Sequence, residues 1–164
     1  IYLTCPNIYK EEGKTFYSHF HFIVSKKNNK EWINKLYTKI ITCNIKKDSV
    51  SKYLKEGCTM IINALPIQYF IKNRIDNSIS LPTDSLSSLK DKEIIKYIEH
   101  MTTYYPKLLN NLKQKKITLM EIPIITYCYN KTCDASTKLN DRLLNIGFVN
   151  IKKYEDGILD WIKH

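Results

Sequence analysis

The chain has 164 residues, of which 43% are hydrophobic and 26% charged, and its formal net charge is +10 at pH 7. This hydrophobic content is enough for the core of one domain and excludes wholesale disorder. No run of about 18 apolar residues occurs, so we expect no membrane span and no membrane partner. The basic charge comes from scattered lysines, and Arg74 and Arg142 are the only arginines, so we do not expect nucleic-acid binding.

Five cysteines occur along the chain, at Cys5, Cys43, Cys58, Cys128 and Cys133. Their number is odd and no two of them form a Cys-x-x-Cys pair, which is atypical of a disulfide-stabilised secreted domain. We therefore expect free thiols, a reducing compartment and a cytoplasmic location. Because the first residue is Ile rather than Met, we also expect the chain to be a piece of a longer protein.

Residues 1–38 are predicted to form a small, β-rich N-terminal extension that packs on the rest of the chain or serves a protein partner. The patterns indicate strands over 1–5 and 15–25, a polar turn over 7–14 and a helical turn over 31–37. Cys5, His19 and His21 are candidate metal ligands, and the two histidines lie on one face of the predicted strand. A structural zinc site normally needs four ligands, so we expect no metal site.

From residue 39 onward, strand-like and helix-like segments alternate along the chain. Apolar, β-branched runs predict strands over 39–45, 59–64, 78–81, 122–126 and 148–152. Helical spacing predicts helices over 48–55, 67–72, 86–116, 135–145 and 160–163. Pro106 is expected to start a second helix inside the long segment, and Gly57 and Gly147 to end helices, while Asp48 or Ser49 is the expected first N-cap. This alternation predicts one α/β domain over 39–164, with a mainly parallel sheet flanked by helices.

Cys128 lies where the predicted strand 122–126 ends and a short loop leads into the predicted helix 135–145. Backbone N–H groups at a helix N-terminus favour negative charge, so a cysteine aimed at them is expected to have a lowered pKa and a more reactive thiolate. A nucleophile that carries sulfur or attacks phosphate needs this arrangement. From spacing alone, a buried cysteine without chemistry is an equally weighted alternative, because free cysteine is often buried.

Several separated blocks of the chain agree in order and spacing with one known family. The blocks are Met60–Pro66, Gln68–Tyr69, Asn73–Pro82, Pro123–Cys128, Gly147–Ile151 and Gly157–Trp161. Over about residues 40–164 the chain resembles a rhodanese-homology domain. The resemblance implies the rhodanese-like α/β fold and a sulfurtransferase activity that uses no cofactor.

The resemblance also implies roles for particular residues. Cys128 would be the nucleophile that takes a sulfane sulfur from a small anionic donor such as thiosulfate and passes it, as a persulfide, to a thiol or cyanide acceptor. The N–H groups of the following loop would bind the anionic sulfur and the incoming anion. This loop consists of Tyr129, Asn130, Lys131, Thr132, Cys133 and Asp134. Lys131 would add positive charge near the thiolate.

The loop departs from the common family pattern Cys-Arg-x-Gly-x-Arg, because its arginines and glycine are missing. It resembles instead a family variant in which a second cysteine follows after four residues and a serine after two more. Cys128, Cys133 and Ser136 match this variant, while Asn63 and Leu65 replace the family's usual Asp and Arg. These changes affect the support of the loop and the charge around it, and they leave the nucleophile in place.

Two other functions stay open. A catalytically weak rhodanese-like module would serve protein interaction or regulation, and a redox switch would use Cys128 and Cys133 if the loop brings them to disulfide distance. Cys133 otherwise packs at the helix start, where Asp134 and Ser136 are expected in the first turn with Asp134 pointing away from the thiolate. Phosphatase chemistry is disfavoured, because position 134 would have to be the arginine of a Cys-x5-Arg loop and is Asp.

Overall fold

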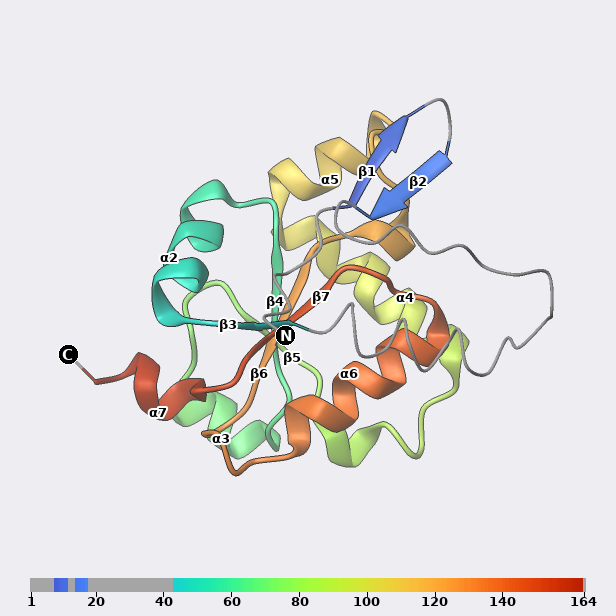
Figure 1. Ribbon diagram of the computed structural model, residues 1–164. Helices are drawn as coiled ribbons and strands as arrows, with labels where there is room; N and C mark the ends of the chain where they lie inside the picture. The colour runs from blue at the N-terminus through green and yellow to red at the C-terminus, as the bar shows by residue number, and fades with distance from the viewer. Residues whose placement is uncertain (1–7, 12–13, 18–42, 164) are drawn as a thin grey trace, which may run out of the picture.

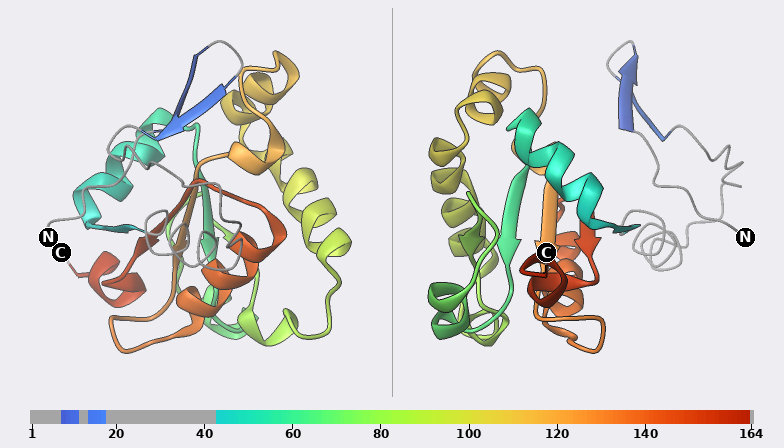
Figure 2. Two further views of the ribbon diagram at one scale, coloured as in Figure 1. Left: turned by 45° about the vertical axis from the view of Figure 1, so that its right-hand side comes forward. Right: turned by 90° about the vertical axis from the view of Figure 1, so that its left-hand side faces the viewer.

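The computed structural model describes residues 8–11, 14–17 and 43–163 (Figure 1). Five strands form the main sheet: β3 (Cys43–Ile45), β4 (Met60–Asn63), β5 (Ile79–Ser80), β6 (Ile124–Tyr127) and β7 (Ile151–Tyr154). Their order is β3-β7-β6-β4-β5, and all four pairings are parallel. The right-hand view of Figure 2 shows these strands side by side. The predicted α/β class with a mainly parallel sheet is confirmed.

Within the described residues, six α-helices connect and follow the strands of the main sheet. They are α2 (Lys47–Glu56), α3 (Ile67–Lys72), α4 (Asp91–Met101), α5 (Pro106–Lys113), α6 (Ala135–Ile146) and α7 (Gly157–Trp161). Short 3-10 turns lie at Thr83–Ser85 (η1), Thr102–Tyr104 (η2) and Leu119–Glu121 (η3). Figure 1 views the sheet nearly edge-on, with α2, α3 and α7 on its left and α4, α5 and α6 on its right.

The distribution of helices follows from the strand order. The chain moves in one direction across the sheet from β3 to β4 to β5, and then in the opposite direction from β5 to β6 to β7. Right-handed crossovers place the helices of these two halves on opposite faces. The neighbouring strands β4 and β6 therefore send their helices, α3 and α6, to opposite sides. The carboxyl ends of β4 and β6 form the switch point of the sheet, where ligands bind in open parallel α/β sheets.

The central strands β4 and β6 are short and rich in apolar residues, and every residue in them is buried, which is typical of a parallel sheet covered on both faces. Helix boundaries follow local chemistry: Pro106 occupies the first position of α5, and Gly57 and Gly147 end α2 and α6 with φ of 71° and 124°. The predicted N-cap at Asp48 or Ser49 is wrong. Lys46 occupies that position, and Asp48 lies in the first turn of α2, where its charge is favourable without a cap bond.

Two further predictions needed correction. The last strand was expected over 148–152 and lies at Ile151–Tyr154, because the N–H groups of Phe148 and Val149 donate to the carbonyls of Leu143 and Met120 instead of to a strand. The predicted turn over 7–14 contains a strand, β1 (Ile8–Glu11), which pairs antiparallel with β2 (Lys14–Tyr17).

Some predictions concern residues that the structure does not describe. The expected strand over 1–5, most of the strand over 15–25, the helical turn over 31–37 and the candidate ligands Cys5, His19 and His21 lie outside the described residues. Within the described ranges, no cluster of three metal-ligating side chains occurs, and no helix is long and apolar enough to cross a membrane. The domain boundary near residue 39 stays a prediction.

Candidate active site

Cys128 follows β6 directly and faces the first turn of α6. Its side chain is 1% exposed. The Ser136 hydroxyl donates a hydrogen bond to Cys128 Sγ at 3.4 Å, and the thiol itself donates to the Cys133 carbonyl at 3.3 Å. The strand, loop and helix predicted around this cysteine are all present. The loop lies at the carboxyl end of β6, at the switch point of the sheet.

The ionisation of Cys128 differs from the sequence-based expectation. Burial raises the pKa of the Cys128 thiol, and the adjacent Cys133 side chain raises this pKa further. Hydrogen bonds from the Ser136 side chain and backbone N–H act in the opposite direction and lower the pKa. The predicted lowering is therefore wrong in its net direction, because exclusion of water outweighs the helix N-terminus.

The loop after Cys128 is stabilised by its own hydrogen bonds. The Asn130 side-chain oxygen accepts from the Thr132 N–H at 3.1 Å and from the Thr132 hydroxyl at 2.9 Å. The Cys133 N–H donates to the Asn130 carbonyl at 3.1 Å. Two of the N–H groups expected to bind an anion, those of Thr132 and Cys133, are thus used inside the loop.

The charged residues of the loop are paired on its outer side. Lys131 Nζ lies 3.2 Å from Asp156 Oδ1, and the other oxygen of Asp156 lies 2.9 Å from Lys46 Nζ. Asp134 pairs with Lys138 at 2.9 Å, and this partner holds the pKa of the Asp134 carboxyl below its usual value. Asp134 therefore turns away from the thiol, as predicted. The charge of Lys131 is balanced by Asp156, which lowers its effect at Cys128.

Sequence reasoning did not connect the start of α7 to the Cys128 loop. The N–H groups of Ile158 and Leu159 donate to the carbonyls of Cys128 and Tyr129 at 2.9 and 3.0 Å. A Cβ at Gly157 would lie 2.6 Å from the Cys128 carbonyl oxygen, and the φ of Gly157 is +68°. The one available signal was the resemblance block Gly157–Trp161, in which this glycine stands first.

Thr83 connects the end of β4 to the start of α6 through its side-chain hydroxyl. Its hydroxyl lies within hydrogen-bond distance of two carbonyls, Ala64 at 3.1 Å and Ala135 at 2.9 Å. These carbonyls belong to the end of β4 and the first turn of α6. Thr83 therefore fixes the distance between the two elements that enclose the switch point, a role that no local pattern indicated.

A pocket of about 680 Å³ lies beside the Cys128 loop. Its lining comes from the end of β4, from α3, from the loop and from α7, and consists of Leu65, Tyr69, Lys72, Asn73, Tyr129, Ile158 and Ile162. The backbone N–H of Ala64 donates to the Tyr127 carbonyl at 2.9 Å, so Leu65 and Cys128 extend from paired neighbouring strands. The pocket therefore occupies the switch point of the sheet.

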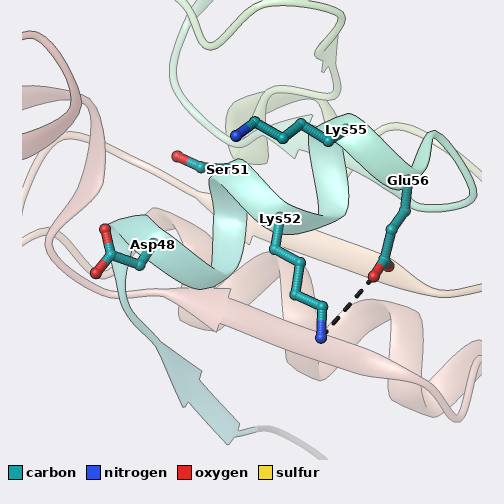
Figure 3. Close-up of a pocket in the computed structure, with 5 residues that line it drawn as sticks. All are labelled: Asp48, Ser51, Lys52, Lys55 and Glu56. Carbon is teal, nitrogen blue, oxygen red and sulfur yellow. Dashed lines mark ion pairs between the residues drawn. The ribbon is translucent and has the colours of Figure 1, made fainter.

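A second hollow lies along α2 and is made by residues of that helix alone (Figure 3). Asp48, Ser51, Lys52, Lys55 and Glu56 line about 460 Å³. Figure 3 shows the side chains of Lys52 and Glu56 directed toward each other, with their charged atoms 3.9 Å apart. None of the five residues belongs to the loop, to a strand end or to α7, so this hollow is separate from Cys128.

Comparisons with proteins of known structure found several similar chains. A protein from Bacillus halodurans of known structure is 20% identical with a TM-score of 0.50, and the match covers 81% of this chain and 80% of that chain. A rhodanese-related protein from Thermoplasma volcanium is 19% identical with a TM-score of 0.45, and the match covers 73% and 90% of the two chains. The human single-domain sulfurtransferase TSTD1 is 11% identical with a TM-score of 0.48, and the match covers 73% and 94%.

A search of curated proteins found no match. The family model of the Rhodanese-like domain matches residues 46–164, which include Cys128, its loop and α7. This match spans well over half of the sequence. The chain therefore belongs to the family of rhodanese-like domains.

Proposed function

We propose that this protein is a sulfurtransferase that moves a sulfane sulfur from a thiosulfate-like donor to a thiol or cyanide acceptor through a persulfide on Cys128. One observation carries the proposal: Cys128 stands at the switch point of a rhodanese-like domain, with its sulfur 3.4 Å from Ser136 in the first turn of α6. Family membership supports sulfur transfer in general, and the position of Cys128 supports this residue as the nucleophile.

The first step forms the persulfide. The Cys128 thiol loses its proton to solvent, and the thiolate attacks the outer sulfur of thiosulfate. A new S–S bond forms while the S–S bond of the donor breaks, and sulfite leaves with the electron pair. The Ser136 hydroxyl and backbone N–H stabilise the negative sulfur, which offsets part of the cost of burial.

The second step returns the enzyme to its starting form. The acceptor, as a thiolate or as cyanide, attacks the outer sulfur of the persulfide. The bond between the two sulfurs breaks, its electrons return to Cys128 as thiolate, and the acceptor leaves as a persulfide or as thiocyanate. No cofactor enters either step.

A second candidate function is a thiol switch between Cys128 and Cys133. It is favoured by the influence of the Cys133 side chain on the ionisation of Cys128 and by the contact of the Cys128 thiol with the Cys133 carbonyl. In that case the Cys133 thiolate would attack the inner sulfur of the Cys128 persulfide. A disulfide would form and hydrosulfide would leave.

The test is intact mass after incubation of the reduced protein with thiosulfate. We expect a gain of one sulfur atom in the wild type and in Cys58→Ser, and no gain in Cys128→Ser. Cyanide should remove the added sulfur. A folded protein that gains no sulfur from thiosulfate, polysulfide or a persulfide donor would contradict sulfur transfer and favour the interaction module. Conversion of the adduct to a disulfide that requires Cys133 would favour the switch.

A further inference from the structure

The pocket between α3, Tyr129 and α7 is separate from the thiol. Cys128 is not among its lining residues, and the Cys128 sulfur is hydrogen-bonded to the Cys133 carbonyl and to Ser136 in the first turn of α6. The volume of about 680 Å³ lies within the range typical of ligand pockets, so large side chains of another protein fit inside it. The occupant of this pocket is therefore to be sought outside the chemistry of Cys128.

Helix α3, which forms one wall of the pocket, is hydrophobic and yet is not packed into the core. None of its six residues is buried. Four of the six are hydrophobic: Ile67, Tyr69, Phe70 and Ile71. A short helix gains most of its stability from the packing of an apolar face. A hydrophobic helix without a buried residue therefore indicates a surface that another chain covers.

Large side chains from three separate parts of the chain are exposed around the pocket. Tyr69 of α3 is 51% exposed, Tyr129 of the loop 44% and Ile162 after α7 44%. The buried side chains of Leu65 and Ile158 also belong to the lining. Exposed tyrosines beside a pocket with apolar walls are typical of protein interfaces, where such a pocket receives an aromatic or aliphatic side chain of the partner.

The charges around the pocket indicate the chemistry of the partner. No lining residue is acidic. Lys72 lines the pocket and Lys163 lies just after α7, and both are exposed and form no ion pair within the part of the chain that the structure describes. Asp156 already pairs with two lysines, and Asp160 of α7 accepts a hydrogen bond from the Tyr154 hydroxyl. The uncompensated charge is therefore positive, which fits an acidic partner.

Two other occupants fit this surface less well. A second copy of the chain would bring together two surfaces of the same sign in a protein with a net charge of +10. Nucleic acid would meet the lysines through its phosphates but would leave aliphatic side chains such as Ile158 and Ile162 without an apolar partner. A protein segment that carries both carboxylates and large apolar side chains matches both features.

We infer that this pocket is a docking site for an acidic segment of a partner protein. A large apolar side chain of that segment occupies the pocket beside Tyr69 and Tyr129, and its carboxylates meet Lys72 and Lys163. The inference goes beyond sulfur transfer and does not depend on it, because no step of that reaction uses the pocket.

The first experiment measures the binding of labelled peptides to the full chain by fluorescence anisotropy. The probe is the synthetic peptide Asp-Glu-Leu-Glu-Glu-Trp-Leu-Glu-Asp-Leu. One control peptide has lysine in place of every acidic residue, and a second has serine in place of every leucine and tryptophan. We expect only the acidic peptide with its apolar side chains to bind, and we expect salt to weaken the binding.

Variants of α3 test whether the peptide uses the pocket. Tyr69→Ala should weaken binding about tenfold through loss of an aromatic contact with the inserted side chain. Lys72→Gln should weaken it about two- to fivefold, as expected for an exposed ion pair. Ile71→Ala is the matched control, because Ile71 is 68% exposed on the same helix and does not line the pocket. Lys55→Gln on α2 is the control for net charge, and both controls should bind as the wild type does.

Backbone amide shifts in NMR spectra locate the bound peptide. We expect shifts at Tyr69, Tyr129 and Ile158 and none along the α2 hollow of Figure 3. The same spectra show whether each variant is folded.

The outcomes separate the docking site from its alternatives. The inference is wrong if the lysine peptide binds equally well, if the pocket amides do not shift, or if Tyr69→Ala and Ile71→Ala lose affinity equally. Self-association in analytical ultracentrifugation that Tyr69→Ala abolishes would assign the surface to a second copy of the chain. Shifts of the pocket amides with a single-stranded oligonucleotide but not with the acidic peptide would assign it to nucleic acid.

Discussion

Gly157 and Cys128 lie in direct backbone contact, with the carbonyl oxygen of Cys128 only 2.6 Å from the point that a Cβ at Gly157 would occupy. The contact joins α7, near the end of the chain, to the loop that follows β6. The backbone N–H groups of Ile158 and Leu159 extend this contact by donating hydrogen bonds to carbonyls of the same loop. The position of the nucleophile therefore depends on residues about thirty positions further along the sequence.

Gly157→Ala should disrupt the loop. The added methyl group overlaps backbone atoms, and alanine is strained at a φ of +68°, so we expect a loss of about 1–3 kcal/mol in the free energy of unfolding. Displacement of the loop should also slow persulfide formation by about tenfold or more. Chemical denaturation and mass spectrometry after thiosulfate measure the two effects.

Gly57→Ala is the matched control for this substitution. Gly57 has nearly the same φ, +71°, but its nearest contact is the flexible Lys107 side chain at 3.6 Å. Gly57→Ala should lower the free energy of unfolding by about 1 kcal/mol through backbone strain and leave the rate of persulfide formation unchanged. Equal losses of persulfide rate in the two variants would contradict the role of the Gly157 contact.

Ser136→Ala should shift the pH dependence of Cys128. The hydroxyl stabilises the thiolate, so its removal should raise the pKa of Cys128 further above its usual value. The rate of alkylation by iodoacetamide rises with pH through this pKa, and the profile of the variant should move to higher pH. At neutral pH, loss of one hydrogen bond should slow the reaction about three- to tenfold. Ser51→Ala on α2 is the control and should show the wild-type pH profile. A wild-type profile in Ser136→Ala would contradict the prediction and assign the Ser136 hydroxyl to packing alone.

Asp156→Asn should increase the reactivity of the site toward anions. Asp156 balances both Lys131 and Lys46, so its neutralisation leaves two uncompensated cations beside the loop. We expect persulfide formation from thiosulfate to accelerate about two- to threefold at low ionic strength and the gain to disappear at about 1 M salt. Asp48→Asn on α2 serves as the control for net charge. An equal acceleration in both variants would assign the effect to net charge and not to Lys131.

Tyr127→Phe should destabilise the sheet next to the nucleophile. The buried Tyr127 hydroxyl accepts the Ile75 N–H at 3.1 Å and lies 2.9 Å from the Ser78 hydroxyl. Removal of the oxygen leaves a buried N–H without its partner, which costs about 1–3 kcal/mol. Thermal unfolding measures the loss. Tyr129→Phe, at an exposed tyrosine two residues away, should leave the melting temperature unchanged.

Local chemistry was sufficient to predict most of the elements. The β-branched runs around Ile61 and Ile125 indicated the two central strands, α3 was predicted with its observed bounds, and Pro106 marked the start of α5. These features depend on residues close together in the sequence. The strand near Phe148 was misplaced because its N–H bonds lie outside the sheet, which periodicity does not reveal.

The candidate site was predictable in part. The position of Cys128 between a strand and a helix followed from spacing, and the pairing of Asp134 with Lys138 links neighbouring helical turns. The direction of the Cys128 pKa shift was not predictable, because it depends on how fully α6, the loop and α7 exclude water from the sulfur. The balance of Lys131 by Asp156 joins residues far apart in sequence and was missed for the same reason.

The sequence by itself determined the α/β class, the order of strands and helices and the identity of the candidate nucleophile. The class and the order of elements follow from the period of apolar residues and from proline and glycine at helix ends. The choice of Cys128 follows from its place at a strand end together with the resemblance to rhodanese-homology domains. Only the tertiary structure decided the burial of that cysteine, the contact of Gly157 with its loop and the pocket shared by α3, Tyr129 and α7. Each of these depends on how close segments remote in sequence lie to one another. Packing and crossover direction set that proximity, and local sequence patterns do not encode it.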